Sequence, residues 1–305
     1  KKDYAEAAEQ YKKAVSLQPN NRAYFSRLYI AYYWQGRYDD ALDAVDKTVL
    51  LMSFAGIGAS LDMVENYPVV TAVFDPSPAK KAGIKAGDKI IEIDGKSTKG
   101  WEIEEVVSKL RGQEGTLVAL TIKPDERGIS VTRERIIPKE ASPIFAYKSL
   151  IQRHKKKEDE ALKDAEQAYS LDPSDKWAQL ALGTSYLDQG RYDEAVKLLL
   201  QVKESTSARV LEATAYAKKS DLKKAINIYS AIPEEKLSPK NVPLWSDRGK
   251  LLKALKPFIA SKMESADRLK MQGRYKEALN ELGDALKVAD ERTTEEICGS
   301  IYRIM

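Results

Sequence analysis

One seven-residue pattern occurs three times in this chain of 305 residues, and it constrains the fold more than any other feature. The copies are QGRYDDA at 35–41, QGRYDEA at 189–195 and QGRYKEA at 272–278. In each copy a glycine suits the end of one helix, acidic residues suit the first turn of the next, and a small alanine lets two helices approach closely. The pattern therefore predicts a helix-turn-helix hairpin that is used repeatedly.

The spacing of the small alanines gives the period of the repeat. Ala7 and Ala41 are 34 residues apart, and so are Ala161 and Ala195. The hairpins and this period resemble the tetratricopeptide repeat (TPR). Two longer intervals deviate from this period. The 53 residues from Ala225 to Ala278 leave room for one extra helix near 243–255, and the 120 residues from Ala41 to Ala161 exceed one repeat by 86. A separate module is thus expected inside the solenoid, and 294–305 is expected to begin a further helix.

Between about residues 53 and 138 the sequence changes from helical periodicity to short β-rich runs. Strands are expected at 69–74, 89–93, 116–122 and 129–137, with helices at 101–111 and about 77–81. Turn-forming residues separate these runs. We therefore expect a multidomain chain: an α-helical TPR solenoid (α-α superhelix) at 1–52 and 139–305, the latter with one extra helix, interrupted by an α+β domain at 53–138.

The sequence of this insert resembles that of a PDZ domain. The resemblance extends from SPAKKAGIKAGDKIIEIDG at 77–95 to the helix that ends at Leu110-Arg111-Gly112. The insert is most similar to the PDZ domains of bacterial C-terminal processing proteases, but no protease domain follows it. The resemblance implies that a peptide adds as a strand beside an exposed sheet edge, with backbone amides of a glycine-containing loop, residues 54–59, holding the terminal carboxylate. The implied residues are Gly56, Ile57, Gly58, Ala59, Leu61, Ile103, Val107 and Leu110. Ile103 stands where some PDZ domains carry a histidine, which favours an apolar peptide residue two before the terminus.

Each repeat carries one apolar stripe that must be buried against the neighbouring hairpin, and the first helix of the hairpin carries a second apolar stripe. These residues face either the concave surface of the superhelix or simply the next helix, and the sequence leaves both interpretations open. They are Ser26, Ile30, Tyr33, Trp34, Trp177, Leu180 and Thr184. Ile30 and Thr184 occupy positions where carboxylate-clamping TPRs use asparagine, which disfavours that mode of binding.

Composition removes several classes of function. The single cysteine and single histidine exclude an intrachain disulfide and a zinc site built from several such ligands, and no cofactor or metal is expected. No apolar run reaches the roughly 18 residues of a transmembrane helix. A net charge of +4 over this length does not favour nucleic acid. The basic run 153–157 is followed at once by three acidic residues and is interpreted as a solvated turn.

These observations predict a non-catalytic scaffold or adaptor. Its PDZ-like groove would bind C-terminal or extended peptides, and its TPR surface would bind protein partners. The alternative is a substrate-presenting subunit of a separate C-terminal processing protease; a nucleic-acid binder acting through 153–157 is a third hypothesis. A homo-oligomer stays open, and the PDZ subtype favours a bacterial envelope location.

Overall fold

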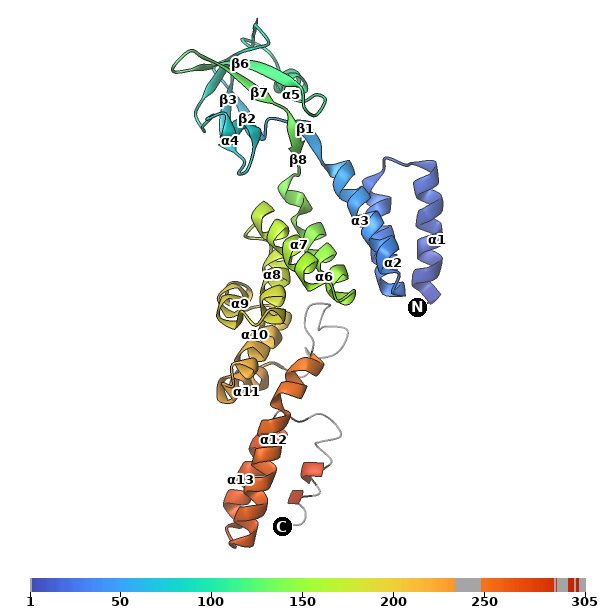
Figure 1. The fold of residues 1–305 in the computed structure, drawn as a ribbon, viewed down its shortest axis with the longest axis vertical. Helices are drawn as coiled ribbons and strands as arrows, with labels where there is room; N and C mark the ends of the chain where they lie inside the picture. Colours follow the sequence, from blue (N-terminus) through green and yellow to red (C-terminus); the bar gives the residue numbers. More distant parts are fainter. Residues whose placement is uncertain (1, 234–247, 288, 290–295, 299, 302–305) are drawn as a thin grey trace. The chain divides into compact units, whose positions relative to one another are not determined.

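The computed structural model describes residues 2–233, 248–287, 289, 296–298 and 300–301, and divides the chain into two compact units. One unit comprises 1–35 with 43–141, and the other comprises 36–42 with 142–305. The expected start of the extra helix at 243–247 and most of the expected helix at 294–305 lie outside the described residues. Figure 1 shows the helical hairpins and the β-rich insert that interrupts them, which confirms the predicted multidomain class.

Most of the helices pack against the next helix along the chain, as the repeated pattern predicts. Before the insert they are α1 (Lys2–Leu17), α2 (Arg22–Gln35) and α3 (Tyr38–Met52). After it they are α6 (Ser142–His154), α7 (Glu158–Leu171), α8 (Lys176–Asp188), α9 (Tyr192–Leu199), α10 (Thr206–Lys218), α11 (Leu222–Ser230), α12 (Arg248–Met271) and α13 (Tyr275–Leu286), with short 3₁₀ turns η1 (Lys139–Ala141) and η2 (Leu200–Val202). α12 is one continuous helix with Pro257 inside it. It includes both the described part of the expected extra helix and the helix that precedes the turn at Gly273.

One turn geometry recurs between paired helices. The N–H of Arg191 donates to the carbonyl of Tyr186 (2.8 Å), and the N–H of Arg274 donates to that of Leu269 (2.9 Å). The residue before each donor, Gly190 or Gly273, has a φ of 75° or 71°, which only glycine adopts without a steric cost. The glycine of the repeated pattern is thus explained by the turn that it closes.

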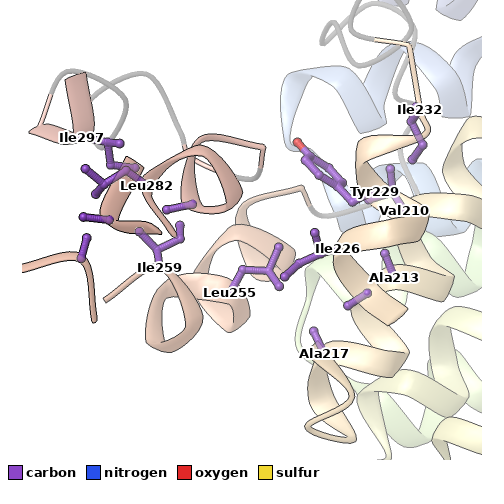
Figure 2. Packing of buried hydrophobic residues seen from close by; sticks show 14 residues of the cluster. Val210, Ala213, Ala217, Ile226, Tyr229, Ile232, Leu255, Ile259, Leu282 and Ile297 are labelled. Atoms are coloured by element: carbon purple, nitrogen blue, oxygen red, sulfur yellow. The ribbon is translucent and has the colours of Figure 1, made fainter. Parts of the chain in front are cut away.

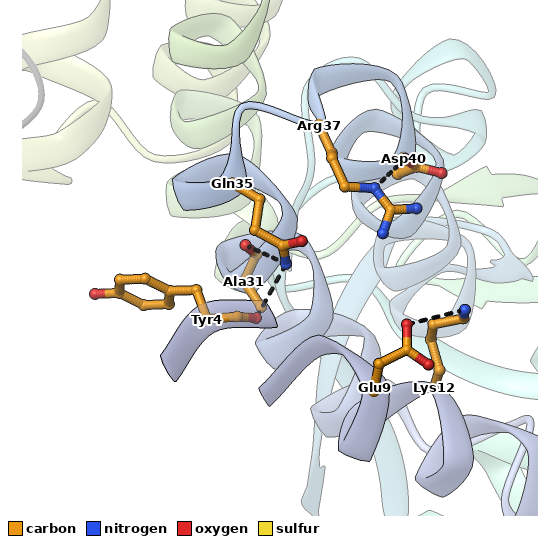
Figure 3. Close-up of polar contacts among 7 residues, drawn as sticks. All are labelled: Tyr4, Glu9, Lys12, Ala31, Gln35, Arg37 and Asp40. Carbon is orange, nitrogen blue, oxygen red and sulfur yellow. Dashed lines mark hydrogen bonds and ion pairs between the residues drawn. The ribbon is translucent and has the colours of Figure 1, made fainter. Parts of the chain in front are cut away.

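The arginine and acidic residue of the pattern pair with each other across the first turn of the second helix. Arg37 Nε lies 2.7 Å from Asp40 Oδ2 (Figure 3), and Arg274 Nε lies 2.8 Å from Glu277 Oε1. The hydrogen bond from Arg274 lowers the pKa of Glu277. Figure 3 also shows how α1 is tied to α2: the Gln35 amide donates to the carbonyl of Tyr4 (3.0 Å) and to that of Ala31 (3.1 Å).

The small alanine that sets the period of the repeat is buried in the second helix of each hairpin from α3 onward. Ala41, Ala161, Ala195, Ala225 and Ala278 are each no more than 2 % exposed. The C-terminal core also contains larger side chains from α10 to α13, and Figure 2 shows Leu255 of α12 pointing toward Ile226 of α11. Burial of these stripes holds successive hairpins together.

The insert consists of a six-stranded sheet, a two-stranded ribbon and two helices. Its elements are β1 (Phe54–Gly56), β2 (Ala59–Val64), β3 (Tyr67–Val73), α4 (Pro78–Lys81), β4 (Lys89–Ile93), β5 (Lys96–Ser97), α5 (Ile103–Leu110), β6 (Leu117–Lys123), β7 (Arg127–Thr132) and β8 (Glu134–Ile136). The strand order β2-β3-β4-β6-β7 places β2 at one edge, and β5 adds to β4. The expected single strand 129–137 is two strands, because the chain changes partner at Arg133: β7 pairs with β6, whereas β8 pairs with β1.

The two ends of the insert are joined by their own ribbon. β1 lies beside β8 (Figure 1) and pairs antiparallel with it. Phe54 is opposite Ile136, and Gly56 is opposite Glu134. This pairing returns the chain close to the point at which it left the helical repeats. The insert has its own core of buried Ile, Val and Leu side chains from the sheet and α5, including Ile90, Val106 and Leu120.

Candidate peptide-binding groove

A hollow of about 310 Å³ lies between the loop before β2, strand β2 itself and helix α5. The residues around it are Phe54, Gly56, Ile57, Gly58, Ala59, Ser60, Leu61, Phe74, Val107, Leu110 and Arg111. Seven of the eight residues proposed for this site from the sequence therefore lie together around one hollow. Ile103 does not border it; its side chain is half-buried at the start of α5.

The loop between β1 and β2 borders this hollow and has unused amides. The carbonyl of Ile57 accepts from Ala79 N (2.8 Å), and that of Gly58 accepts from Phe74 N (3.0 Å). Among the described residues, the N–H groups of Ile57 and Gly58 donate to no backbone carbonyl. Consecutive free amides in a turn form a concavity that suits an anion. The side chain of Ile57 points into the domain core and is 3 % exposed, so this residue offers its backbone to the site.

Gly58 cannot be replaced without disturbing this loop. Its φ is 75°, and a Cβ placed on it would lie 2.5 Å from Cβ of Ser77. Ser77 is itself fixed, because its hydroxyl accepts from Lys80 N and caps α4. The glycine is thus required by both the backbone conformation and the close approach of α4.

The free edge of β2 continues directly from the loop. Ala59 lies opposite Val73, and the bond from Phe74 N to the carbonyl of Gly58 makes this a pair whose own N–H and C=O groups point away from each other. The N–H and C=O of Ala59 consequently face the open side of β2. Since β2 is at the edge of the sheet, these groups are available to an added strand.

Helix α5 forms the opposite wall. It is amphipathic: Val106 and Leu110 are buried in the core of the domain, whereas Val107 is half-buried at the hollow. The end of the helix is held by Arg133, whose guanidinium donates to the carbonyls of Lys109 (2.7 Å), Leu110 (3.1 Å) and Leu117 (2.7 Å). Arg133 therefore fixes the last turn of this wall against the strands.

Three of the lining residues lie outside the site that the sequence predicted: Ser60, Phe74 and Arg111. Ser60 and Arg111 adjoin predicted residues, so proximity in the chain was the available signal. Phe54 begins the predicted loop 54–59 and also borders the hollow. Phe74 follows β3, and the pairing of β3 with β2 brings it there.

The stripe residues proposed for the TPR surface differ in burial. Tyr33, Leu180 and Thr184 are at most 6 % exposed, so these side chains pack within the repeats. Ser26, Ile30 and Trp177 are half-buried. Trp34 is exposed and stacks on Tyr4, with ring centres 5.7 Å apart. Of this stripe, Trp34 offers the most open side chain.

A hollow of about 710 Å³ in the repeats is lined by residues of α11, α12 and α13. Lysines line it, but the acidic residues beside them already neutralise part of their charge. Lys262 lies 3.0 Å from Glu281 and 3.4 Å from Asp284, and Lys287 lies 2.7 Å from Asp284. These contacts raise the pKa of Lys262 and lower that of Asp284.

The basic run 153–157 is engaged in ion pairs. Arg153 Nη2 lies 3.2 Å from Asp188 Oδ1, and Lys155 pairs with Asp39. Lys157 lies 3.6 Å from Glu160. Within the described ranges, no helix is long and apolar enough to cross a membrane, and no cluster of three or more His, Cys, Asp or Glu side chains is placed to hold a metal.

Comparison with family models identifies both parts of the chain. A PDZ-domain model matches residues 69–124, and tetratricopeptide-repeat models match 2–51, 154–207 and 181–241. The chain therefore contains a PDZ domain and TPR repeats, as the sequence predicted. Both are protein-interaction domains.

Curated relatives match over 85 residues. A "Probable CtpA-like serine protease" of Staphylococcus aureus (strain bovine RF122 / ET3-1) is 40 % identical, and one of Staphylococcus haemolyticus (strain JCSC1435) is 41 % identical. Each match covers 27 % of this chain and only 17 % of the relative. Among solved structures, the PDZ domain of a carboxy-terminal protease from Vibrio cholerae in complex with a peptide is 27 % identical, with a TM-score of 0.26; the match covers 28 % of this chain and 97 % of that one.

Proposed function

We propose that this chain is a non-catalytic adaptor that binds peptide tails in the groove between β2 and α5 and holds protein partners on its TPR repeats. The observation that carries the proposal is the open edge of β2, which begins directly after a loop with two unused amides. A peptide laid along this edge would gain backbone hydrogen bonds from β2 and place its last side chain in the apolar hollow beside Val107 and Leu110.

The energetics favour weak binding by the groove alone. One buried apolar side chain contributes about 1.5–3 kcal/mol, and each net hydrogen bond contributes about 1 kcal/mol. Association costs at least about 4 kcal/mol. A single tail should therefore bind with a Kd near micromolar or weaker. A second contact on the TPR repeats would raise the effective concentration of a partner whose tail occupies the groove.

Two matched substitutions on α5 test the groove. Val107→Glu places a charge at the hollow, while Ser108→Glu places the same charge on the exposed next position. We expect Val107→Glu to weaken binding of an apolar-ended decapeptide at least tenfold, because it removes apolar contact and repels the carboxylate, and Ser108→Glu to change it less than twofold. Fluorescence anisotropy of labelled peptides on the full chain measures both. Equal affinity in all three proteins would exclude the groove as the binding site.

The 40 % identity to CtpA-like serine proteases over 85 residues supports a second candidate. In this role the chain presents tails to a separate C-terminal processing protease. The test adds the full chain to such a protease and follows cleavage of a tail-bearing substrate. Faster cleavage that Val107→Glu abolishes would support presentation, whereas an unchanged rate would leave only the adaptor role.

A further inference from the structure

The hollow lined by α11, α12 and α13 lies between two successive hairpins and combines apolar with charged side chains. Ile226 of α11 belongs to the hydrophobic core of these hairpins, and Phe258 of α12 packs against that core. Both side chains border the hollow. Its volume of about 710 Å³ lies within the range of about 300–1,000 Å³ that is usual for binding sites.

The charged side chains at this hollow carry an excess of positive charge. Lys223, Lys262 and Lys287 line it together with Asp284. Glu281 adds a second carboxylate, because it lies 3.0 Å from Nζ of Lys262. Asp284 is shared by two lysines, at 3.4 Å from Lys262 and 2.7 Å from Lys287. Three cations therefore face two carboxylates.

Lys223 is the cation that these carboxylates do not pair with. Its side chain is exposed near the start of α11, and it forms no ion pair with any other described residue. The side chain of Lys287 is also open, with 57 % of its surface exposed, whereas that of Lys262 is only 23 % exposed. An incoming anion can thus reach Lys223 and Lys287 without breaking a buried contact.

A comparable hollow earlier in the repeats has the opposite charge. It has a volume of about 350 Å³ and is lined by α7, α8 and α9, so that it also lies between the second helix of one hairpin and the helices of the next. Its charged lining residues are Glu166, Glu194 and Lys197. The excess of positive charge is therefore particular to the hollow at α11, α12 and α13, and is not a general feature of these hairpins.

We propose that this hollow binds an acidic segment of a protein partner, one that also carries apolar side chains. Carboxylates of the segment pair with Lys223 and Lys287, and an apolar side chain contacts Ile226 and Phe258. This inference rests on the proposed role of the TPR repeats in holding protein partners, and it names the place and the chemistry of that contact. It does not depend on the groove between β2 and α5.

The test uses a labelled peptide of glutamates and leucines that is acetylated and amidated at its ends, so that it offers no terminal carboxylate to the groove. Fluorescence anisotropy on the full chain measures its binding, and the same peptide with glutamine in place of glutamate is the uncharged control. We expect the acidic peptide to bind at least tenfold more tightly at low salt. High salt should remove most of this preference, because it screens the attraction between exposed charges.

Two substitutions with opposite expected effects locate the site. Lys223→Glu should weaken binding of the acidic peptide about three- to tenfold, because an unpaired cation becomes an anion. Asp284→Asn should tighten binding about two- to fivefold, because it releases Lys287 and part of the charge of Lys262 for the ligand. Lys276→Glu is the matched control: Lys276 is exposed at the opposite end of α13 from Lys287, and its reversal should change affinity less than twofold.

The outcomes separate this inference from the proposed function. Binding that neither Lys223→Glu nor Asp284→Asn alters would overturn this site and leave the role of the TPR repeats in place. Binding that Val107→Glu abolishes would place the peptide in the groove and also overturn the inference. A single-stranded RNA that displaces the acidic peptide at a lower concentration than the unlabelled peptide would overturn the assignment to a protein partner. If tail peptides failed to bind while the acidic peptide bound as expected, the groove function would fail and this inference would stand.

Discussion

Single residues in left-handed conformation end the first helix of the TPR hairpins. Glycine occupies this position at Gly190 and Gly273, but Lys156 (φ 59°) and Ser220 (φ 65°) occupy it in two other hairpins. The turn is the same, since the N–H after each of these residues donates to a carbonyl five residues earlier, as in Asp221 to Tyr216 (2.9 Å). A side chain in this conformation costs about 1–2 kcal/mol.

Replacing these residues with glycine should therefore stabilise the protein. We expect Ser220→Gly and Lys156→Gly each to raise the free energy of unfolding by about 0.5–1 kcal/mol, because relief of strain exceeds the added entropy of the unfolded chain. The control Ser220→Ala should give no gain, and Gly190→Ala should destabilise by about 1 kcal/mol. Urea unfolding of the four variants measures these changes. Destabilisation by both glycine substitutions would show that the turn is not strained.

At the scale of elements, helix α5 depends on one buried arginine. Arg133 is 8 % exposed and has no carboxylate partner among the described residues; backbone carbonyls and the Thr116 hydroxyl accept its hydrogen bonds. It satisfies carbonyls that the helix end would otherwise leave unpaired. The groove wall is thus held from the strands rather than by the helix itself.

Arg133→Met should consequently destabilise the PDZ domain. Loss of these bonds leaves buried carbonyls unsatisfied, and we expect a loss of about 3 kcal/mol. Arg135→Met is the matched control: Arg135 is exposed and pairs with Glu114 at 2.9 Å, so its removal should cost less than about 1 kcal/mol. Hydrogen exchange of the β4 and β6 amides reports opening of this domain. Similar exchange in both variants would contradict the role given to Arg133.

The sequence predicted elements better than it predicted contacts between them. The strand 89–93 was placed with its observed bounds, because alternating apolar residues and flanking turns define it locally. The break between β7 and β8 was missed, since no turn-forming residue marks it and it lies where the chain changes its pairing partner from β6 to β1. Phe74 was missed because its contribution to the groove depends on strand pairing, which the local pattern does not encode.

For the TPR stripe, the sequence predicted which residues share a helix but not which of them are buried. Helical spacing correctly placed Leu180 and Thr184 on one helix, but spacing alone cannot tell a concave surface from a contact with the next helix. Both side chains are buried, and the Thr184 hydroxyl donates to the carbonyl of Leu180 (2.7 Å). Burial depends on how the hairpins stack, so it required the structure.

At the scale of the whole molecule, the chain combines a repeat scaffold with one inserted binding domain. The β1–β8 ribbon joins the two ends of the insert, so the PDZ domain is added without a long connection. Its groove lies between β2, α5 and the loop that follows β1. In the proposed function, the TPR hairpins would hold folded partners and the groove would hold a flexible tail.

The central claim is that an incoming chain end binds to the free amides before and within β2. Hydrogen exchange of the full chain, with and without a free-acid decapeptide that it binds, tests this most directly. The amides of Ile57, Gly58 and Ala59 should exchange quickly in the free protein and become protected when the peptide is bound. Protection that is already present in the free protein, or exchange that the bound peptide leaves unchanged, would contradict the claim.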